Sequence, residues 1–124
     1  MKVPKNLFKE LNAWVGSGKK YDSEKRVWTG SEEHFGFVPY PGTLNVAIRP
    51  VLGVSDKDVT IQPFEDFVCY EGRYNGELIW LCYSKYRNTD DISTFYVVSE
   101  HRLRDKYDLQ DKQKIKIRIK KEMN

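Results

Sequence analysis

Thr43 and Asn45 are the two side chains whose types and spacing point most directly to chemistry. They lie two residues apart, so on an extended backbone both face one side of the chain, while Leu44 faces the other side. A hydroxyl oxygen and an amide oxygen then point together, and both are ligands that a hard cation such as Mg²⁺ accepts. The alternative is that Thr43 caps a turn and that Asn45 bonds to nearby backbone. The spacing therefore predicts a small polar site at the start of a strand, with Leu44 in a core.

A glycine-rich segment, Gly16-Ser17-Gly18-Lys19-Lys20, offers a second kind of chemistry. Glycines let neighbouring backbone N–H groups turn toward one anion, and lysines add positive charge. The segment has the residue spacing of neither a P-loop nor a dinucleotide-binding fingerprint. It is therefore either a loop that cradles phosphate or an ordinary hairpin turn with solvated lysines.

Basic residues alternate with Ile115, Ile117 and Ile119 near the end of the chain, in Lys114–Lys120. This period of two predicts a strand with its isoleucines inward and its cations in solvent, where lysines would guard a sheet edge. The net charge of +3 suits an anionic small ligand but is too small to argue for nucleic acid. An RNA-binding barrel is the alternative that this basic stripe leaves open.

Cys69 and Cys82 lie in apolar and aromatic surroundings on segments that we expect to be strands. A metal or redox motif would need closer spacing or more ligands, so we predict two reduced thiols in the core.

A family resemblance joins these segments. Gly36–Asn45 closely resembles the G-F-x-P-Y-x-G-T-L-N signature of the archaeal-type, CTP-dependent riboflavin kinases. The glycine-rich segment followed by Tyr21, and the segment Arg102–Leu109 leading into Lys114–Lys120, support the match through their order and spacing. The resemblance covers the chain from about residue 12 to residue 120.

The resemblance implies a phosphotransferase that uses CTP and Mg²⁺ to convert riboflavin to FMN, leaving CDP. Thr43 and Asn45 match the positions that hold Mg²⁺ beside the nucleotide phosphates. Because two neutral ligands bind Mg²⁺ weakly, the metal would arrive with the nucleotide. Arg104 aligns with an arginine in the region that contacts the base and ribose. The residues implied to bind the nucleotide are Gly16, Ser17, Gly18, Lys19, Lys20, Tyr21, Arg102, Leu103 and Arg104.

The acceptor side departs from the family pattern. The resemblance places flavin contacts at Ser93, Thr94 and Tyr96, with a carboxylate close to Ser93 or Tyr96. Neither position is acidic in this chain, and the nearby substitutes are Asp90, Asp91, Thr94 and Glu100. Phosphoryl transfer needs positioning and charge stabilisation rather than a covalent nucleophile, although a base for the acceptor hydroxyl would help. The candidates for that base are Asp91 and Glu100, with Asp22 and Glu24 as further carboxylates. The aromatic side chains that could stack on a flat ring, or belong to the barrel core or rim, are Trp28, Tyr40 and Tyr96.

Two other functions therefore stay open. One is a kinase of the same barrel family that acts on a different hydroxylated acceptor. The other is a non-catalytic module that binds a nucleotide or a flavin.

Many short strands with little helix predict a mainly β protein, and the resemblance implies a six-stranded cradle-loop barrel with one or two short helices. A chain of 124 residues is a single domain on length, with residues 1–11 as a possible N-terminal extension in which Leu7, Phe8 and Leu11 form one side of a helix. We expect short helical turns at Ser31–His34 and His101–Tyr107, and a loop at Glu71–Gly76. The expected strands are Ala13–Val15, Leu44–Ile48, Val59–Ile61, Asp66–Tyr70, Glu77–Tyr83, Thr94–Val98 and Lys114–Lys120.

No apolar run approaches the ~20 residues that a membrane-spanning helix needs. The first residues, Met1–Lys5, have no apolar stretch of the kind found in secretory signals. We therefore expect a cytoplasmic monomer whose partners are the small molecules CTP and riboflavin.

Overall fold

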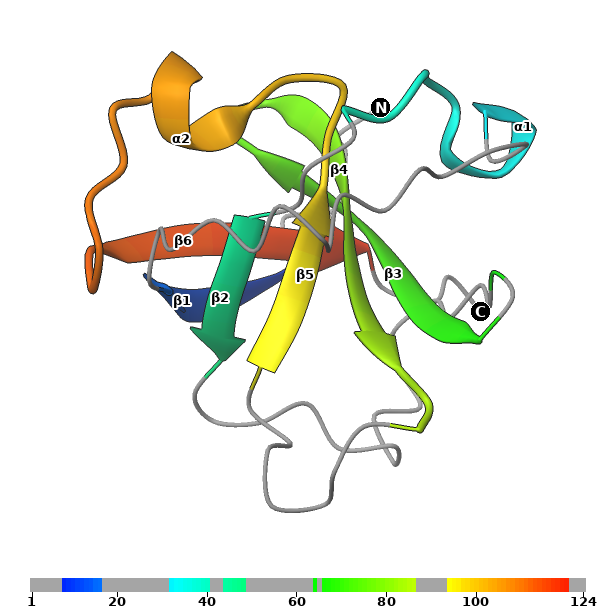
Figure 1. The fold of residues 1–124 in the computed structure, drawn as a ribbon, viewed down its shortest axis with the longest axis horizontal. Helices are drawn as coiled ribbons and strands as arrows, with labels where there is room; N and C mark the ends of the chain where they lie inside the picture. Colours follow the sequence, from blue (N-terminus) through cyan, green and yellow to red (C-terminus); the bar gives the residue numbers. More distant parts are fainter. Residues whose placement is uncertain are drawn as a thin grey trace, which may run out of the picture.

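The structure of the protein is a computed structural model that describes residues 8–16, 32–40, 44–48, 64, 66–86 and 94–120. The described part of the chain consists mainly of strands, with two short helices (Figure 1). The elements in chain order are β1 (Phe8–Val15), α1 (Glu32–Phe35), β2 (Leu44–Ile48), β3 (Phe67–Tyr74), β4 (Glu77–Ser84), β5 (Thr94–Val98), α2 (Leu103–Lys106) and β6 (Lys114–Lys120).

The strands form a closed barrel in the order β1-β2-β5-β4-β3-β6, in which every neighbouring pair is antiparallel. Both helices lie toward the same end of the barrel in Figure 1. The closed six-stranded β-barrel with two short helices confirms the predicted fold class.

Alternation of apolar and polar residues explains how the strands close around one core. In β6 the three isoleucines are buried while the basic residues between them are exposed, as predicted. Leu44, Val46 and Ile48 of β2 are buried in the same way, which confirms that Leu44 faces the core. Such one-sided strands fill the inside of a small barrel with side chains and turn their other face outward.

A second apolar cluster covers the outside of β3, β4 and β5. It contains Phe35 of α1, together with Phe67, Cys69, Trp80, Cys82 and Val98 from the strands. The indole N–H of Trp80 donates a hydrogen bond of 2.9 Å to the Phe35 carbonyl, which fixes α1 on this face. Because β4 lies between the barrel interior and this outer cluster, it is buried on both faces from Ile79 to Tyr83.

The two cysteines are neighbours within the outer cluster. Cys69 and Cys82 are cross-strand partners, both fully buried and both free, with 3.1 Å between their Sγ atoms. Burial, together with the contact to Cys69, raises the pKa of the Cys82 thiol well above its ordinary value. The prediction of two core thiols is confirmed.

The helix predicted around Leu7, Phe8 and Leu11 is wrong for its described residues. Phe8–Val15 is one continuous strand that pairs with β6 from Phe8 to Trp14. Residues 8–11 are therefore part of the barrel and not of an N-terminal extension. Leu11, Ala13 and Val15 share the inward face of this strand. The three-residue spacing of Phe8 and Leu11 fits one face of a helix, which explains the wrong prediction.

The loop predicted at Glu71–Gly76 is also wrong over most of its length. The strand β3 continues to Tyr74, and the turn consists of Asn75 and Gly76, whose φ angles are 50° and 81°. This is the positive-φ conformation that an Asn-Gly pair favours in a two-residue hairpin. Gly72 is a strand residue, which pairs with Ile79 of β4 and Ile119 of β6. It allows close approach of the strands, because a Cβ atom there would lie 2.4 Å from the Arg118 carbonyl oxygen of β6.

The basic residues of β6 do not guard an edge, because β6 pairs with β1 on one side and β3 on the other. Their charge is partly neutralised by acidic residues of these neighbouring strands. Glu10 lies 3.4 Å from Lys116 and 4.0 Å from Arg118, and Glu71 lies 3.8 Å from Lys120.

Most other predicted elements agree with the structure. The bounds predicted for β2, β5 and β6 are those observed, and α2 lies within the predicted turn at His101–Tyr107. The predicted strand Val59–Ile61 lies outside the described residues, as does Ser31, the first residue of the turn predicted at Ser31–His34. Neither helix in the described part of the chain is long and apolar enough to cross a membrane.

Candidate functional site

Gly16 and Asn45, which the sequence assigns to a phosphate loop and a metal site, are neighbours on the outside of the barrel. The Gly16 N–H donates a hydrogen bond of 2.7 Å to the Asn45 carbonyl. A Cβ atom at Gly16 would lie 3.0 Å from that carbonyl oxygen and 3.3 Å from the Asn45 Cβ. A Cβ atom there would crowd the Asn45 backbone, so the start of the glycine-rich segment lies directly against Asn45.

Asn45 is the half-buried residue between two inward-facing neighbours, Leu44 and Val46. Its side chain therefore points out of the barrel, toward the side on which Gly16 lies. Among the residues that the structure describes, no hydrogen bond engages its amide group, so the amide oxygen is available to a cation. Thr43, the second expected ligand, lies outside the described residues.

Tyr96 extends this arrangement onto β5. It is the cross-strand partner of Asn45 on one side and of Cys82 on the other. Its half-buried ring meets the Phe67 ring edge to face, with 6.3 Å between the ring centroids. Gly16, Asn45 and Tyr96 therefore form one outward-facing row across β1, β2 and β5, which we call the outer row.

Arg104 reaches the outer row from α2. Its guanidinium donates a hydrogen bond of 2.8 Å to the Gly16 carbonyl through Nη2. Through Nη1 it contacts the Leu109 carbonyl at 3.3 Å and a carboxylate oxygen of Asp111 at 2.9 Å. The Arg104 side chain is 22% exposed, whereas its partner Asp111 is 55% exposed, so solvent reaches this ion pair.

The other two residues of the Arg102–Arg104 segment have different surroundings. Arg102 is half-exposed and pairs with Asp105 at 2.8 Å, three residues further along α2. Leu103, which the resemblance implies to bind the nucleotide, is buried in the barrel core. Of the three side chains, Arg104 is the one that the structure brings to the outer row.

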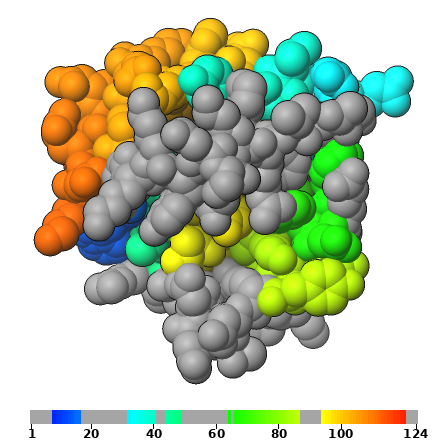
Figure 2. Space-filling model, in the orientation of Figure 1, coloured from blue at the N-terminus to red at the C-terminus, as the bar shows by residue number. Residues whose placement is uncertain are grey.

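The chain between α2 and β6 also holds the end of β1. Val15 exchanges two backbone hydrogen bonds of 2.8 Å with this connection, one from its N–H to the Gln113 carbonyl and one to its own carbonyl from the Lys112 N–H. Figure 2 shows the α2–β6 segment, in orange, beside β1, in blue. The last residues of β1 are thus fixed by β2, by the connection and by Arg104.

The structure describes some of the residues expected on the acceptor side, including Thr94, Tyr96 and Tyr40. Thr94 is the partner of Ala47 and begins β5, two residues before Tyr96, so both face outward near Asn45. Tyr40 is 37% exposed, and its N–H donates to the Ser99 carbonyl at 2.7 Å. Outside the described residues lie Ser17, Gly18, Lys19, Lys20, Tyr21, Asp22, Glu24, Trp28, Asp91 and Ser93.

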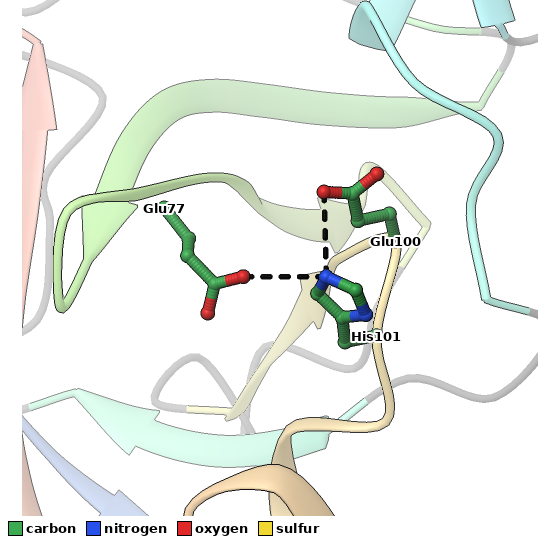
Figure 3. A group of neighbouring side chains, drawn as sticks. All are labelled: Glu77, Glu100 and His101. Carbon is green, nitrogen blue, oxygen red and sulfur yellow. Dashed lines mark ion pairs between the residues drawn. The ribbon is translucent and has the colours of Figure 1, made fainter.

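Glu100, a predicted candidate base, belongs to a different group of titratable side chains. Figure 3 shows Glu77, Glu100 and His101 pointing toward one another at the end of the barrel. The His101 Nε2 lies 3.4 Å from a carboxylate oxygen of each glutamate. The three ligand atoms lie within 4.8 Å of one another, which is a spacing that a metal ion could bridge.

The contacts of Glu77 favour a structural role for this group. The Glu77 oxygen that faces His101 also binds the Lys106 ammonium, and the other oxygen accepts a hydrogen bond from the Tyr107 hydroxyl. Burial alone would raise the pKa of Glu77, but the bonds from Lys106 and Tyr107 outweigh it and hold that pKa below its ordinary value. A cation at Glu77 would have to displace Lys106, so the group ties the β3–β4 hairpin to α2.

Sequence reasoning missed contacts that form only when the barrel folds, both at the outer row and at the Glu77 group. The Gly16–Asn45 approach depends on how β1 and β2 are aligned, which no local pattern indicates. Asp111 and Glu77 are common surface residue types, and their partners Arg104 and Lys106 are close only after folding. The signal that did exist was Gly16 itself, because glycine at a strand end is typical of close backbone approach.

A comparison with protein families gives one match. The model of the CTP-dependent riboflavin kinase family, described as a domain of unknown function (DUF120), matches residues 13–119. A comparison with curated proteins finds no match. The family match spans the barrel from β1 to β6, and the chain belongs to this family.

Proposed function

We propose that this member of the CTP-dependent riboflavin kinase family transfers the terminal phosphate of CTP to riboflavin, giving FMN and CDP. The observation that carries the proposal is the outer row, in which Gly16 and Asn45 touch across β1 and β2. A phosphate-binding loop and a metal ligand must be adjacent if one nucleotide is to contact both. Family membership supplies the choice of donor and acceptor.

The residues of the outer row fit the proposed metal. Asn45 offers a half-exposed amide oxygen next to the start of the glycine-rich segment, and Thr43 would add a hydroxyl oxygen. Bound there with the nucleotide, Mg²⁺ would neutralise charge on the phosphates. The N–H groups of Gly16–Lys20 and the two lysines would then hold the phosphates in place.

Acceptor binding in this proposal involves Thr94 and Tyr96 on β5, with Ser93 before them. The ring of Tyr96 is held by Phe67 beside Asn45, so it offers a fixed edge to a flat acceptor. Asp91 and Glu100 remain the candidate bases. Glu100 would have to exchange its contact with His101 for the acceptor hydroxyl.

The first test is a transfer assay with the purified protein, Mg²⁺, riboflavin and each of CTP, ATP, GTP and UTP, in which FMN is measured by chromatography. FMN formation that depends on CTP and Mg²⁺ is expected. No FMN from any nucleotide, at enzyme concentrations where the protein is folded, would contradict the proposal.

Substitution of the metal ligands tests the site. We expect Thr43→Ala combined with Asn45→Ala to lower kcat/KM for CTP by roughly a hundredfold, because charge stabilisation by positioned ligands is a large part of phosphoryl transfer. Asn12→Ala is the matched control, since Asn12 is a half-buried asparagine on the outer face of β1. Turnover that is unchanged in the double variant would exclude these residues as the metal site.

A different acceptor is the second candidate function. It rests on the missing carboxylate near Ser93 and Tyr96, where the family resemblance implies an acidic residue. A screen of hydroxylated acceptors with CTP distinguishes the two, because this candidate predicts CTP consumption with another acceptor and none with riboflavin. CTP binding without any Mg²⁺-dependent turnover would instead indicate a non-catalytic module.

A further inference from the structure

Cys69 and Cys82 are the only cysteines of the chain, and the barrel places them opposite each other on β3 and β4. Opposed residues of antiparallel strands have Cα atoms about 4.5–5.5 Å apart, and a disulfide spans Cα separations of about 4.4–6.8 Å. The two Sγ atoms lie 3.1 Å apart. A bond of about 2.05 Å between them therefore requires the sulfurs to approach by about 1 Å, without a change of strand register.

The surroundings of the cysteine pair decide which reagents can reach it. Both thiols are fully buried in the outer cluster, together with Phe35 of α1 and Trp80. The cover that α1 provides is one short helix, held by the hydrogen bond from Trp80 to the Phe35 carbonyl. Local opening of this cover would admit a small oxidant. Burial raises the pKa of the Cys82 thiol well above its ordinary value, so this thiol reacts slowly while the cover is closed.

The pair also ends a row of cross-strand partners that begins in the candidate site. Asn45 is the partner of Tyr96, which is the partner of Cys82. Cys82 is in turn the partner of Cys69. Phe67, whose ring meets that of Tyr96, lies on the same face of β3 as Cys69. A covalent link between the two sulfurs would therefore tie β3, which carries Phe67, to the strand that pairs with Tyr96.

We propose that Cys69 and Cys82 are the site of a reversible disulfide, formed with hydrogen peroxide as the oxidant, that joins β3 to β4 beside the outer row. One thiol sulfur attacks a peroxide oxygen and the O–O bond breaks, which gives a sulfenic acid and one water molecule. The second thiol sulfur then attacks the sulfenic sulfur. The S–S bond forms, the S–O bond breaks, and the hydroxyl leaves as water with the proton of the second thiol.

The electrons of this reaction balance between the two sulfurs and the peroxide. The two sulfurs together lose two electrons, which the O–O bond takes up, and an external dithiol reverses the reaction by thiol–disulfide exchange. The inference is independent of the riboflavin assignment, because it concerns two strands of the barrel and needs no nucleotide or flavin.

Mass spectrometry of the wild-type protein tests the site directly. After treatment with hydrogen peroxide, unfolding and alkylation, neither cysteine should carry the alkylating agent. Trypsin cleaves after Arg73, between the two cysteines, so the digest should contain two joined peptides whose summed mass is lower by two hydrogen atoms. Dithiothreitol should restore two alkylatable thiols. Thiols that stay free after prolonged treatment, sulfinic acid at either cysteine, or a disulfide between two chains would overturn the inference.

Single-cysteine variants are the matched controls for the chemistry. Cys69→Ala and Cys82→Ala each keep one thiol, so oxidation should give a sulfenic acid that dimedone traps. The wild type should give several-fold less dimedone adduct under the same conditions, because the neighbouring thiol displaces the oxygen first. Equal trapping in the wild type and in both variants would mean that the two sulfurs do not react with each other, and the inference would fail.

Two phenylalanine variants test whether the outer cluster controls access to the thiols. Phe35→Leu loosens the cover, whereas Phe95→Leu makes the same change inside the barrel, where Phe95 is fully buried. At urea concentrations that give both variants equal stability, oxidation should be several-fold faster in Phe35→Leu. Equal rates would mean that the thiols react only in the unfolded chain, and this result would overturn a disulfide site built into the barrel.

Urea unfolding tests whether the disulfide fits the native barrel. The bond would join positions 13 residues apart, and such a link restricts the unfolded chain. The midpoint of unfolding of the wild type should therefore rise by about 1 M on oxidation and return on reduction, with no shift in Cys69→Ala. A midpoint that does not rise would show that the bond strains the pairing of β3 with β4, contrary to the inference.

Discussion

At the scale of single residues, the candidate site depends on Gly16, which has no Cβ atom. The missing Cβ leaves room for its close contact with Asn45, and the Gly16 carbonyl accepts a hydrogen bond from Arg104. Asn45 and Arg104, which have different expected roles, therefore both contact Gly16. A change at Gly16 should therefore affect phosphate binding and metal binding together.

Gly16→Ala tests this convergence. The added Cβ would lie 3.0 Å from a backbone oxygen that cannot move without shifting β2, so the β1 end must tilt away. Overpacking of this kind costs about 1–3 kcal/mol in the free energy of unfolding. Because the displaced end of β1 begins the glycine-rich segment, we also expect kcat/KM for CTP to fall by roughly tenfold, which is about 1.4 kcal/mol in the barrier. Kinetics at several Mg²⁺ concentrations should show that more metal is needed for half-maximal rate.

Gly76→Ala serves as the control for that experiment. Gly76 lies in the β3–β4 turn, where a Cβ would have no atom within 4 Å. Its positive φ predicts some loss of stability but normal kinetics. If Gly16→Ala retained the kinetic constants and the Mg²⁺ dependence of the wild type, the contact with Asn45 would not matter for function.

At the scale of elements, sequence patterns predicted the strands whose two faces differ clearly. The alternation of isoleucine and basic residues defined β6, and Leu44–Ile48 was defined by the prolines and glycine around it. The pattern failed at the end of β3, where Gly72 and the following Asn75-Gly76 pair both indicated a turn. Glu71 and Arg73 nevertheless point outward around Gly72, as alternate residues of a strand do.

The candidate site was predictable as a set of residues but not as a geometry. Gly16, Asn45 and Arg104 were each identified from local sequence. Their meeting depends on strand alignment and on the path of the chain after α2, and both are decided by packing of the whole barrel. The roles assigned to them remain predictions.

The α2 element depends on pH through its contact with the β3–β4 hairpin. Glu77 has a lowered pKa in the folded protein because Lys106 and Tyr107 bind its carboxylate more strongly than burial disfavours it. A depressed pKa contributes stability above the unfolded-state pKa, and that stability is lost as the pH falls through the folded-state value. Acidification below about pH 4.5, the ordinary value for this group, should therefore weaken the hold on α2.

Urea unfolding between pH 3 and pH 7 checks the prediction. Glu77→Gln should be less stable than the wild type by about 0.5–1 kcal/mol at neutral pH, as for partly exposed ion pairs, and the difference should shrink toward pH 3. Glu33→Gln, at an exposed glutamate of α1, should show no such pH-dependent difference. A Glu77→Gln deficit that stays constant with pH would mean that packing, and not charge, holds the hairpin to α2.

At the scale of the whole molecule, the barrel closes at a seam far from the candidate site. The β3–β6 seam has a short paired register, Gly72 with Ile119 and Arg73 with Arg118, whereas β1 pairs with β6 from Phe8 to Trp14. If the short seam opened, β6 would still hold β1, but the barrel would lose its curvature. Closure at Gly72 and close approach at Gly16 both rely on a missing Cβ.

Gly72→Ala should open the β3–β6 seam, because the new Cβ would lie 2.4 Å from the Arg118 carbonyl oxygen. We expect a loss of about 1–3 kcal/mol in the free energy of unfolding, measured by urea denaturation. Hydrogen exchange should show lost protection at Gly72 and Ile119, while the β1–β2 seam at Val15 and Val46 stays protected. Equal stability and unchanged exchange in this variant would mean that the β3–β6 seam accommodates the added Cβ without opening. Loss of protection at both seams together would instead show that the barrel opens as one cooperative unit, so that a substitution remote from the outer row weakens the Gly16–Asn45 contact as well.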